Sequence, residues 1–415
     1  MHLETLDILR CPYCGGRLEL VTSSYHHRDD RYIHDGILGC HCCVFPVVAG
    51  IPVLHLLPGA STAREQIEAG RPDRALRTMF NLDDEQQAAR FEAIASSKTA
   101  TYRDLIEALG PNIESGYFLY RFSDPTYVIA NAVVQAVAGA ILGDGGRAID
   151  ICGGSGHLTR SLLELSSSPP VLTDLYFAKI WLARRFTAPG CEPVCCDGNA
   201  PLPFARGAFR YAMCCDAFHY IWTKRQFVSE MVRLIGEDDA GAVVINHTHS
   251  QRTWSPSHGE PLPPEGYRDL FETLEPRLFG EAGLLADLVQ GESINLARRD
   301  SDETLEADPA LTIVASMHRA VFGLHRVATP PAEARGEFHV NPLYAIEADA
   351  DPVRLRLRFP SDEYEEEYGA CRQYLPAEIA IERASLTALQ SGRLPSDLRD
   401  LVRQRVIVDL PKNYY

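Results

Sequence analysis

Two cysteine pairs near the N-terminus have the spacing of a metal site. Cys11 and Cys14 form the sequence CPYC, and Cys40 and Cys43 form a second C-x-x-C within CHCC. Two such pairs supply the four thiolates that structural zinc binds tetrahedrally. Four nearby residues could substitute as ligands: His26, His27, His41 and Cys42. We predict a closed zinc site formed by Cys11, Cys14, Cys40 and Cys43, whose role is to stabilise this part of the chain.

A glycine-rich loop follows an apolar run in the sequence AIDICGGSG. Gly153, Gly154 and Gly156 would let a ligand approach the backbone closely, and the helix predicted after them would offer free N–H groups. A dinucleotide fingerprint needs one more glycine where Thr159 stands, and the chain has no P-loop motif. Asp150, near the end of the apolar run, would suit a cationic amino group better than a pyrophosphate. The loop therefore predicts a nucleotide-type ligand other than NAD or ATP.

Further acids follow the next β-like runs. Asp174, followed by Leu175, ends VLTD, and Asp197, followed by Gly198, ends PVCCD; Asp216 follows the run YAMCC. An acid at the end of the second strand of a doubly wound sheet is placed to bond ribose hydroxyls. Each acid alone could be a solvated loop residue. Because the carboxyl ends of parallel strands meet at one edge of a sheet, the acids together predict cofactor binding beside the glycine loop.

These segments resemble a known family. AIDICGGSGHL, VLTD and PVCCDGNAPLPFARGAFRYAMCC, in this order, are similar to the cofactor motifs of class I S-adenosylmethionine-dependent methyltransferases, over about residues 121–322. The family usually has glycine at position 152 and Phe-Asp at positions 209–210, where this chain has Cys152 and Phe209-Arg210. The resemblance implies S-adenosylmethionine as cofactor and a Rossmann-like sheet of seven strands, with GAVVINH and LTIVASM as the fifth and seventh. The residues implied to contact the cofactor are Asp150, Cys152, Gly153, Gly154, Gly156, Asp174, Leu175, Asp197, Gly198 and Asp216.

A second resemblance covers about residues 5–55. LDILRCPYCGGRLEL and GILGCHCCVFPVVAGIPVL are similar to the small zinc-binding domain that activates tRNA, rRNA and release-factor methyltransferases. In those systems the domain is often a separate subunit, and some bacterial rRNA methyltransferases carry a related one fused at the N-terminus. This resemblance raises RNA as an alternative methyl acceptor.

Three histidines are candidates for the chemistry at the acceptor. His219 follows the fourth predicted strand, and His247 and His249 end the fifth. An oxygen acceptor needs a general base, for which a histidine near its ordinary pKa is suited. A nitrogen acceptor can react with positioning alone, and no N-P-P-Y motif follows the fourth strand. The same histidines could instead form the wall of the cofactor pocket.

The elements that must position these residues divide the chain into four predicted parts. Residues 1–56 form a β-rich zinc-binding domain, and residues 57–120 a helical linker or lid. In residues 121–328, β-like and helical runs alternate, as in a parallel sheet with crossover helices. Residues 329–415, beginning at TPPAEARGEF, form a small α+β extension. The predicted fold class is therefore α/β.

Composition limits the possible partners. The chain has 415 residues, a formal net charge of −16 and twelve cysteines. The acidic balance argues against a nucleic-acid substrate. No apolar run reaches the roughly 18 residues of a membrane helix, and the start MHLETLDILRCPYC lacks the features of a secretory signal. We therefore expect a cytoplasmic protein with reduced thiols.

The sequence as a whole predicts a methyltransferase that modifies an oxygen or nitrogen atom of a small-molecule or sugar-like acceptor. Two alternatives stay open: an RNA methyltransferase with a fused zinc domain, and a methyltransferase-like scaffold without activity. The sequence identifies neither the acceptor nor the oligomeric state.

Overall fold

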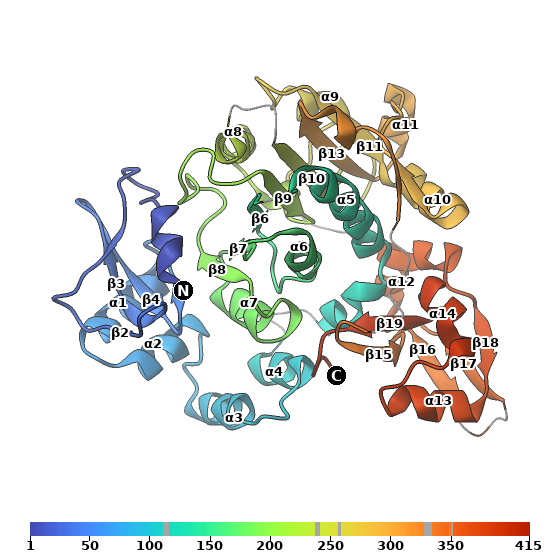
Figure 1. Cartoon of the computed structure of the whole chain (residues 1–415), viewed down its shortest axis with the longest axis horizontal. Coiled ribbons are helices and arrows are strands. Elements are labelled where there is room, and N and C mark those ends of the chain that lie inside the picture. The colour runs from blue at the N-terminus through green and yellow to red at the C-terminus, as the bar shows by residue number, and fades with distance from the viewer. Residues whose placement is uncertain are drawn as a thin grey trace.

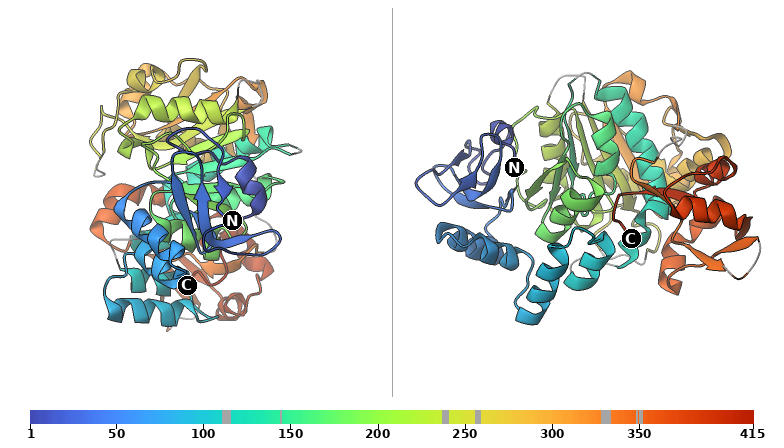
Figure 2. Two further views of the ribbon diagram at one scale, coloured as in Figure 1. Left: turned by 90° about the vertical axis from the view of Figure 1, so that its left-hand side faces the viewer. Right: turned by 60° about the horizontal axis from the view of Figure 1, so that its bottom comes forward.

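The computed structural model describes residues 1–110, 116–143, 145–236, 241–255, 259–327, 334–347, 349 and 352–415 (Figure 1). A seven-stranded sheet lies at the centre, with an N-terminal β domain on one side and a C-terminal part on the opposite side. Figure 2 shows this arrangement from two further directions. The predicted fold class, an α/β sheet domain between a small β-rich domain and an α+β extension, is confirmed.

The central sheet has the order β11-β13-β10-β9-β6-β7-β8. Its strands are β6 (Ala148–Ile151), β7 (Val171–Asp174), β8 (Glu192–Cys195), β9 (Tyr211–Cys215), β10 (Ala242–His249), β11 (Pro276–Gly280) and β13 (Ala310–Ser316). Strands β6 to β10 are parallel, whereas β13 is antiparallel to both β10 and β11. The segments predicted as the fifth and seventh strands are β10 and β13, as expected.

Within the parallel part of the sheet, the chain reverses its direction of travel between β8 and β9. It moves outward from β6 through β7 to β8 and then returns to place β9 on the other side of β6. In open α/β sheets, ligands bind at such a reversal, outside the carboxyl ends of the strands. The loops after β6 and β9 flank this point.

Helices cover both faces of the sheet. One hydrophobic cluster joins the sheet to α5, α6, α7 and α10, and a second joins it to α8. These helices are α5 (Pro125–Ile141), α6 (Thr159–Leu165), α7 (Phe177–Leu182), α8 (Lys224–Ile235) and α10 (Glu281–Gly291). Within β6, Ala148 belongs to the first cluster and Ile149 and Ile151 to the second. Alternation of side chains along the strand therefore places Asp150 on the α5 face.

The N-terminal β domain is an antiparallel half-barrel that covers the β8 edge of the sheet. Its strands are β1 (Glu19–Leu20), β2 (His27–Arg28), β3 (Ile33–Gly39), β4 (Val44–Val48) and β5 (Ile51–Pro52). Val53, just after β5, pairs in parallel with Cys195 of β8, and the Leu54 N–H donates to the Cys195 carbonyl at 2.7 Å. An exposed edge strand invites pairing with other chains, and this contact closes it.

Helices connect this domain to the sheet, and the remaining elements follow it. The connecting helices are α1 (Pro58–Glu68), α2 (Pro72–Met79), α3 (Glu85–Ala95), α4 (Tyr102–Leu109) and the 3₁₀ helix η2 (Gly116–Ser123). Late elements of the sheet domain are α9 (Pro264–Arg268), β12 (Ser293–Asn295), α11 (Asp302–Ala307) and β14 (Leu324–Arg326). The C-terminal part contains β15 (Glu337–Val340), β16 (Tyr344–Glu347), β17 (Val353–Leu357), α12 (Asp362–Tyr368), β18 (Glu378–Ile381), α13 (Arg383–Gln390), α14 (Arg399–Arg403) and β19 (Ile407–Leu410).

The domain boundaries stay predictions. The predicted boundary between residues 328 and 329 falls within 328–333, outside the described residues. Across the described ranges, no helix combines the length and the apolar character needed to span a bilayer.

The C-terminal tail ties three of the predicted parts together. Tyr414 is fully buried, and its ring stacks on Tyr102 of α4 with centroids 4.7 Å apart. Its hydroxyl donates to the Phe118 carbonyl at 2.8 Å and lies 2.8 Å from Nε2 of His157, in the loop after β6. The tail therefore holds η2 and the β6 loop against each other.

We expect graded losses of stability from shortening Tyr414. Tyr414→Phe keeps the ring but leaves buried polar groups without a partner, which should lower the free energy of unfolding by about 1–3 kcal/mol. Tyr414→Ala also creates a cavity and should cost about 3–5 kcal/mol. Urea unfolding followed by circular dichroism measures both. A loss below about 1 kcal/mol for the alanine variant would show that the tail is not part of the core.

Candidate functional site

Three residues at the carboxyl ends of adjacent strands have left-handed backbone conformations. These are Cys152 after β6 (φ 59°), Asp216 after β9 (φ 54°) and His247 within β10 (φ 50°). This region is unfavourable for residues other than glycine, and such residues cluster at functional sites. The strain marks the reversal point between β6 and β9, together with the neighbouring strand β10, as the candidate site.

Asp150 lies directly beneath the glycine loop. The residue is 1% exposed, and Oδ2 accepts a hydrogen bond of 2.6 Å from the Thr159 hydroxyl. Oδ1 has no hydrogen-bond partner among the described residues. A Cβ atom on Gly153 would lie 2.5 Å from the carboxyl group, so only glycine fits above it. Burial raises the pKa of Asp150 to about 7, as expected for a buried carboxyl group without a cationic partner.

Asp174 ties the end of β7 to the glycine loop. Its two oxygens accept hydrogen bonds from the backbone N–H groups of Gly154 (3.0 Å) and Tyr176 (2.9 Å). Burial raises the pKa of Asp174, an effect that Lys179 opposes. The side chain is half-buried, and each oxygen keeps a further lone pair that could accept a hydroxyl hydrogen. Leu175, the next residue, is half-buried, and its carbonyl oxygen accepts a hydrogen bond from the Cys195 thiol at 3.3 Å.

The loop after β8 contacts the glycine loop from the other side. Asp197 Oδ1 accepts the backbone N–H of Asn199 at 2.8 Å. A Cβ atom on Gly198 would lie 2.9 Å from Sγ of Cys152, so glycine is needed for this approach. At Gly156 the glycine serves packing, because a Cβ atom there would lie 2.9 Å from the Cβ of Ala183. The structure thus brings the predicted cofactor residues of β6, β7 and β8 into one group of contacting loops.

Arg121, which the sequence analysis did not single out, holds Asp216 in place. The guanidinium is buried and binds Asp216 Oδ2 at 3.0 Å and Asp124 Oδ2 at 3.3 Å. Burial would raise the pKa of Asp216, but Arg121 outweighs it and the pKa is lowered. The one local signal was an arginine three residues before the acid that caps α5, in RFSDP.

His247 forms an ion pair with Glu281, at the start of α10. The ring Nδ1 lies 2.7 Å from Glu281 Oε2, and the His247 backbone N–H donates to Oε1 at 2.9 Å. Burial lowers the pKa of His247, but Glu281 outweighs this effect and raises it to about 9. A ring already protonated at neutral pH cannot accept a proton, which favours the other two histidines as candidates for a base. Nothing in the sequence indicated Glu281 as a partner.

His219 and His249 form a stacked pair beside Asp216. Their ring centroids are 4.2 Å apart with an interplanar angle of 12°, and the His249 ring is 5.3 Å from that of His247. Burial lowers the pKa of His219 to about 3 and that of His249 to about 4. Both rings are therefore neutral at physiological pH. The structure brings all three predicted catalytic histidines together at the ends of β9 and β10.

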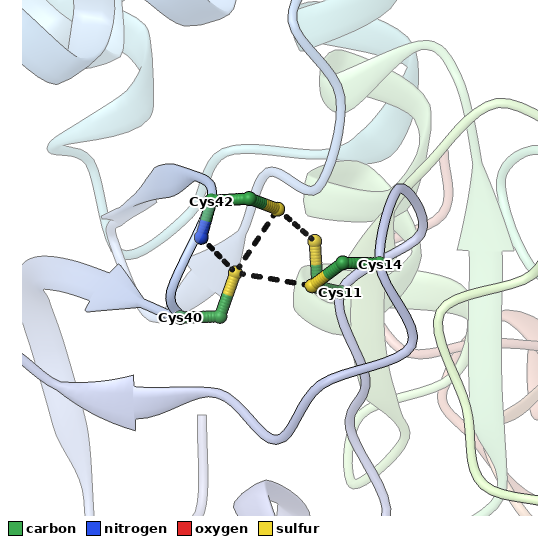
Figure 3. A group of neighbouring side chains, drawn as sticks. All are labelled: Cys11, Cys14, Cys40 and Cys42. Carbon is green, nitrogen blue, oxygen red and sulfur yellow. Dashed lines mark hydrogen bonds between the residues drawn. The ribbon is translucent and has the colours of Figure 1, made fainter.

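Four cysteine sulfurs gather at one end of the N-terminal β domain (Figure 3). They belong to Cys11, Cys14, Cys40 and Cys42, and all lie within 4.8 Å of one another. The Sγ–Sγ distance is 3.7 Å for Cys11–Cys42 and for Cys14–Cys40, and 3.6 Å for Cys40–Cys42. Four thiolates on a tetrahedral zinc ion with bonds of about 2.3 Å are separated by roughly 3.8 Å. The donor set and its spacing fit zinc.

One member of this set differs from the prediction. Cys43 was predicted from the C-x-x-C spacing, but the group contains Cys42 instead. In the tight turn before β4, the Cys43 N–H donates to Cys40 Sγ, and the Cys43 carbonyl accepts the Cys40 N–H. These bonds fix the backbone of Cys43, whose sulfur lies 3.3 Å from that of Cys42, next to the group. Burial raises the pKa of Cys40, but the N–H groups of Cys42 and Cys43, with neighbouring thiols, lower it to about 7.

Two cavities elsewhere in the described residues do not include the strand ends. One of about 720 Å³ is lined by α2 and α3, and one of about 420 Å³ lies between α5, α6 and the C-terminal part. Neither is lined by the candidate cofactor residues or the three histidines.

Comparisons with known proteins gave matches among solved structures alone. No family model matches the chain, and no curated protein matches it. Solved structures that match include the YcgJ protein of Bacillus subtilis (15% identity, TM-score 0.33), covering 48% of this chain and 100% of that one. Geranyl diphosphate C-methyltransferase of Streptomyces coelicolor A3(2) matches at 15% identity and TM-score 0.32, covering 42% and 73%.

A third match is a chain from the complex between the Haloferax volcanii Trm112 methyltransferase activator and a methyltransferase. It has 16% identity and a TM-score of 0.34, and the match covers 45% of this chain and 89% of that one. The description of the fold rests on the strand order of the central sheet, since these matches have TM-scores of 0.34 or less. They establish neither an activity nor a substrate.

The cysteine group makes a prediction about metal content. Cys42→Ser should release zinc and loosen the N-terminal β domain, because it removes one of four ligands. Cys43→Ser, the matched control, should keep one zinc ion per chain. Elemental analysis of the purified variants measures the difference. The opposite result, zinc lost only from Cys43→Ser, would restore the ligand set predicted from the spacing.

Proposed function

We propose that the protein is an S-adenosylmethionine-dependent methyltransferase that modifies an oxygen or nitrogen atom of a small-molecule or sugar-like acceptor. The observation that carries the proposal is the arrangement at the reversal point: Asp150, Asp174, Asp197 and Asp216 lie in or after four adjacent parallel strands. An open α/β sheet binds its ligand at this place. Neither the fold nor the comparisons identify the reaction.

The residues present suit the parts of this cofactor. The Oδ1 of Asp150, which has no hydrogen-bond partner among the described residues, would accept a cationic amino group. Asp174, half-buried at the end of the second strand, is placed for ribose hydroxyls. Asp197 and Gly198, next to Cys152, would contact the adenine ring of the cofactor. When bound, S-adenosylmethionine supplies a methyl group on a sulfonium that is already electrophilic.

The acceptor would lie on the other side of the reversal point. The side chains there come from β9 and β10: Asp216, His219 and His249, with His247 fixed by Glu281. Arg121 orients Asp216 and balances its charge. The rings of His219 and His249, neutral at physiological pH, would position the acceptor.

The acidic net charge of −16 supports a small acceptor over RNA, because a protein that grips a phosphate backbone usually presents a basic face. The proposed zinc ion in the cysteine group has no open position for substrate, since four thiolates complete its coordination. Its role in the proposal is therefore to stabilise the domain that covers β8.

We expect S-adenosylmethionine and S-adenosylhomocysteine to bind the wild-type protein with micromolar affinity. Asp174→Ala removes a carboxylate that we place on the ribose and that also braces the loop. It should weaken binding by about 1–3 kcal/mol, or roughly 5- to 150-fold, without unfolding the protein. Isothermal titration calorimetry measures both quantities.

Glu303→Ala, which removes an exposed acid in α11, is the control and should bind like the wild type. Unchanged affinity in Asp174→Ala would remove this residue from the site. No binding to folded, zinc-loaded wild-type protein, even after addition of candidate acceptors, would leave the scaffold as the better interpretation. Tight binding of RNA at physiological salt would favour the RNA alternative.

A further inference from the structure

Asp216, His219 and His249 form a second group of potential metal ligands, separate from the cysteines. A carboxylate oxygen and one nitrogen from each ring all lie within 4.8 Å of one another. Bonds of about 2.1 Å to a shared ion would bring such atoms to roughly 3–3.5 Å. The two stacked rings would therefore have to turn out of their parallel arrangement for their nitrogen lone pairs to converge on the ion. Two imidazoles and one carboxylate are a common donor set for divalent transition metals.

The second observation is independent of this spacing. His219 is 1% exposed, yet neither of its ring nitrogens has a hydrogen-bond partner among the described residues. A buried polar group without a partner costs free energy, and native structures nearly always satisfy such groups. Stacking on His249 satisfies the ring faces but neither nitrogen. A bound cation would supply a partner for one of the two nitrogens.

The two other candidate ligands are held by neighbouring groups. The Ser255 hydroxyl lies 2.7 Å from Nδ1 of His249, which fixes the ring and leaves Nε2 as the atom for a metal. Arg121 binds one oxygen of Asp216 at 3.0 Å, and a carboxylate can bind an ion through its other oxygen. Hydrogen bonds of this kind orient the ligands in metal sites.

The backbone also directs these residues toward one point. The pairing of β10 with β13 shifts between Ile245 and Thr248, a bulge that contains the left-handed residue His247. A bulge re-aims the side chains that follow it, here including His249. After β9, the left-handed residue Asp216 begins the turn that leads to His219.

The surrounding charges can accommodate a divalent cation. Three acids, Asp124, Asp216 and Glu281, face two cations, Arg121 and His247. With all five charged, the group carries one net negative charge. A divalent ion would leave one net positive charge, which would suit an acceptor with an anionic or readily ionised oxygen.

We propose that Asp216, His219 and His249 bind a divalent first-row transition metal ion at the acceptor side of the strand ends. Imidazole ligands favour such an ion over magnesium or calcium, whereas the thiolates of the N-terminal β domain favour zinc. The role of the ion rests on the proposed function: it would present its open coordination positions to oxygen atoms of the methyl acceptor, such as a hydroxyl group beside a second oxygen. The acceptor class is then an oxygen chelator rather than an amine.

The test titrates zinc-loaded full-length protein with Mn²⁺, measured by electron paramagnetic resonance of the free ion, and with Co²⁺, measured by visible absorption. We expect one Mn²⁺ or Co²⁺ per chain in addition to the zinc. His219→Phe is the decisive variant, because phenylalanine keeps the buried ring and removes the nitrogens. It should weaken binding at least tenfold while the protein stays folded.

Matched variants separate the two metal sites. His325→Phe, the same substitution at a ring bonded to the Val321 carbonyl, should keep the Mn²⁺ site. Cys40→Ser should lose zinc and keep the Mn²⁺ site, while Asp216→Asn should weaken Mn²⁺ binding and keep the zinc.

The proposal is overturned if neither Mn²⁺ nor Co²⁺ binds the wild type, or if His219→Phe binds as tightly as the wild type. A more stable His219→Phe with unchanged Mn²⁺ binding would show that His219 is only a packing residue. Titration with S-adenosylhomocysteine, run separately with and without Mn²⁺, distinguishes the two proposals. If the metal binds and the cofactor does not, the metal site stands and the methyltransferase proposal fails. If the cofactor binds and the metal does not, the methyltransferase proposal stands and the metal site fails.

Discussion

The reversal of the chain about β6 is the constraint on which the site depends. Because β9 returns to the other side of β6, the loops after these two strands must turn away from each other directly after the strands end. Cys152 and Asp216 accept left-handed backbone conformations to do so. Such conformations cost free energy and persist only where the surroundings enforce them. At Cys152 the close contacts of Gly153 with Asp150 and of Gly198 with Cys152 provide that enforcement, and at Asp216 the bond to Arg121 does.

Buried charges stabilise the acceptor side in a different way. An unpaired buried ion is strongly unfavourable, so each charge must meet a partner at short range. Arg121 meets Asp124 and Asp216, and His247 meets Glu281. These pairs connect η2, α5 and α10 to the ends of β9 and β10. The segment before the sheet domain therefore contributes directly to the geometry of the site, through a single guanidinium group.

The sequence predicted the features that depend on local patterns. Apolar runs that end in acids identified the strands, and the glycine spacing identified the loop, because both reflect requirements of the backbone at neighbouring positions. Glu281 could not be found this way, since its partner His247 lies 34 residues earlier and only the packing of α10 brings them together. Arg121 and Asp216 are 95 residues apart. Asp150 was predicted to lie beside the glycine loop, but its place beneath Gly153 depends on the face of β6 that α5 covers.

The cysteine group differs in one member from the set that the local spacing predicted. The C-x-x-C spacing predicted Cys43, whereas the sulfur of Cys42 lies in the group and the Cys43 backbone makes two bonds to Cys40 in the turn that starts β4. The position of the domain gives this group its importance for the site. Val53 and Leu54 pair with Cys195, the last residue of β8, two positions before Asp197. A metal that stabilises the half-barrel would thereby stabilise the edge of the sheet, and with it the loop that contacts Cys152.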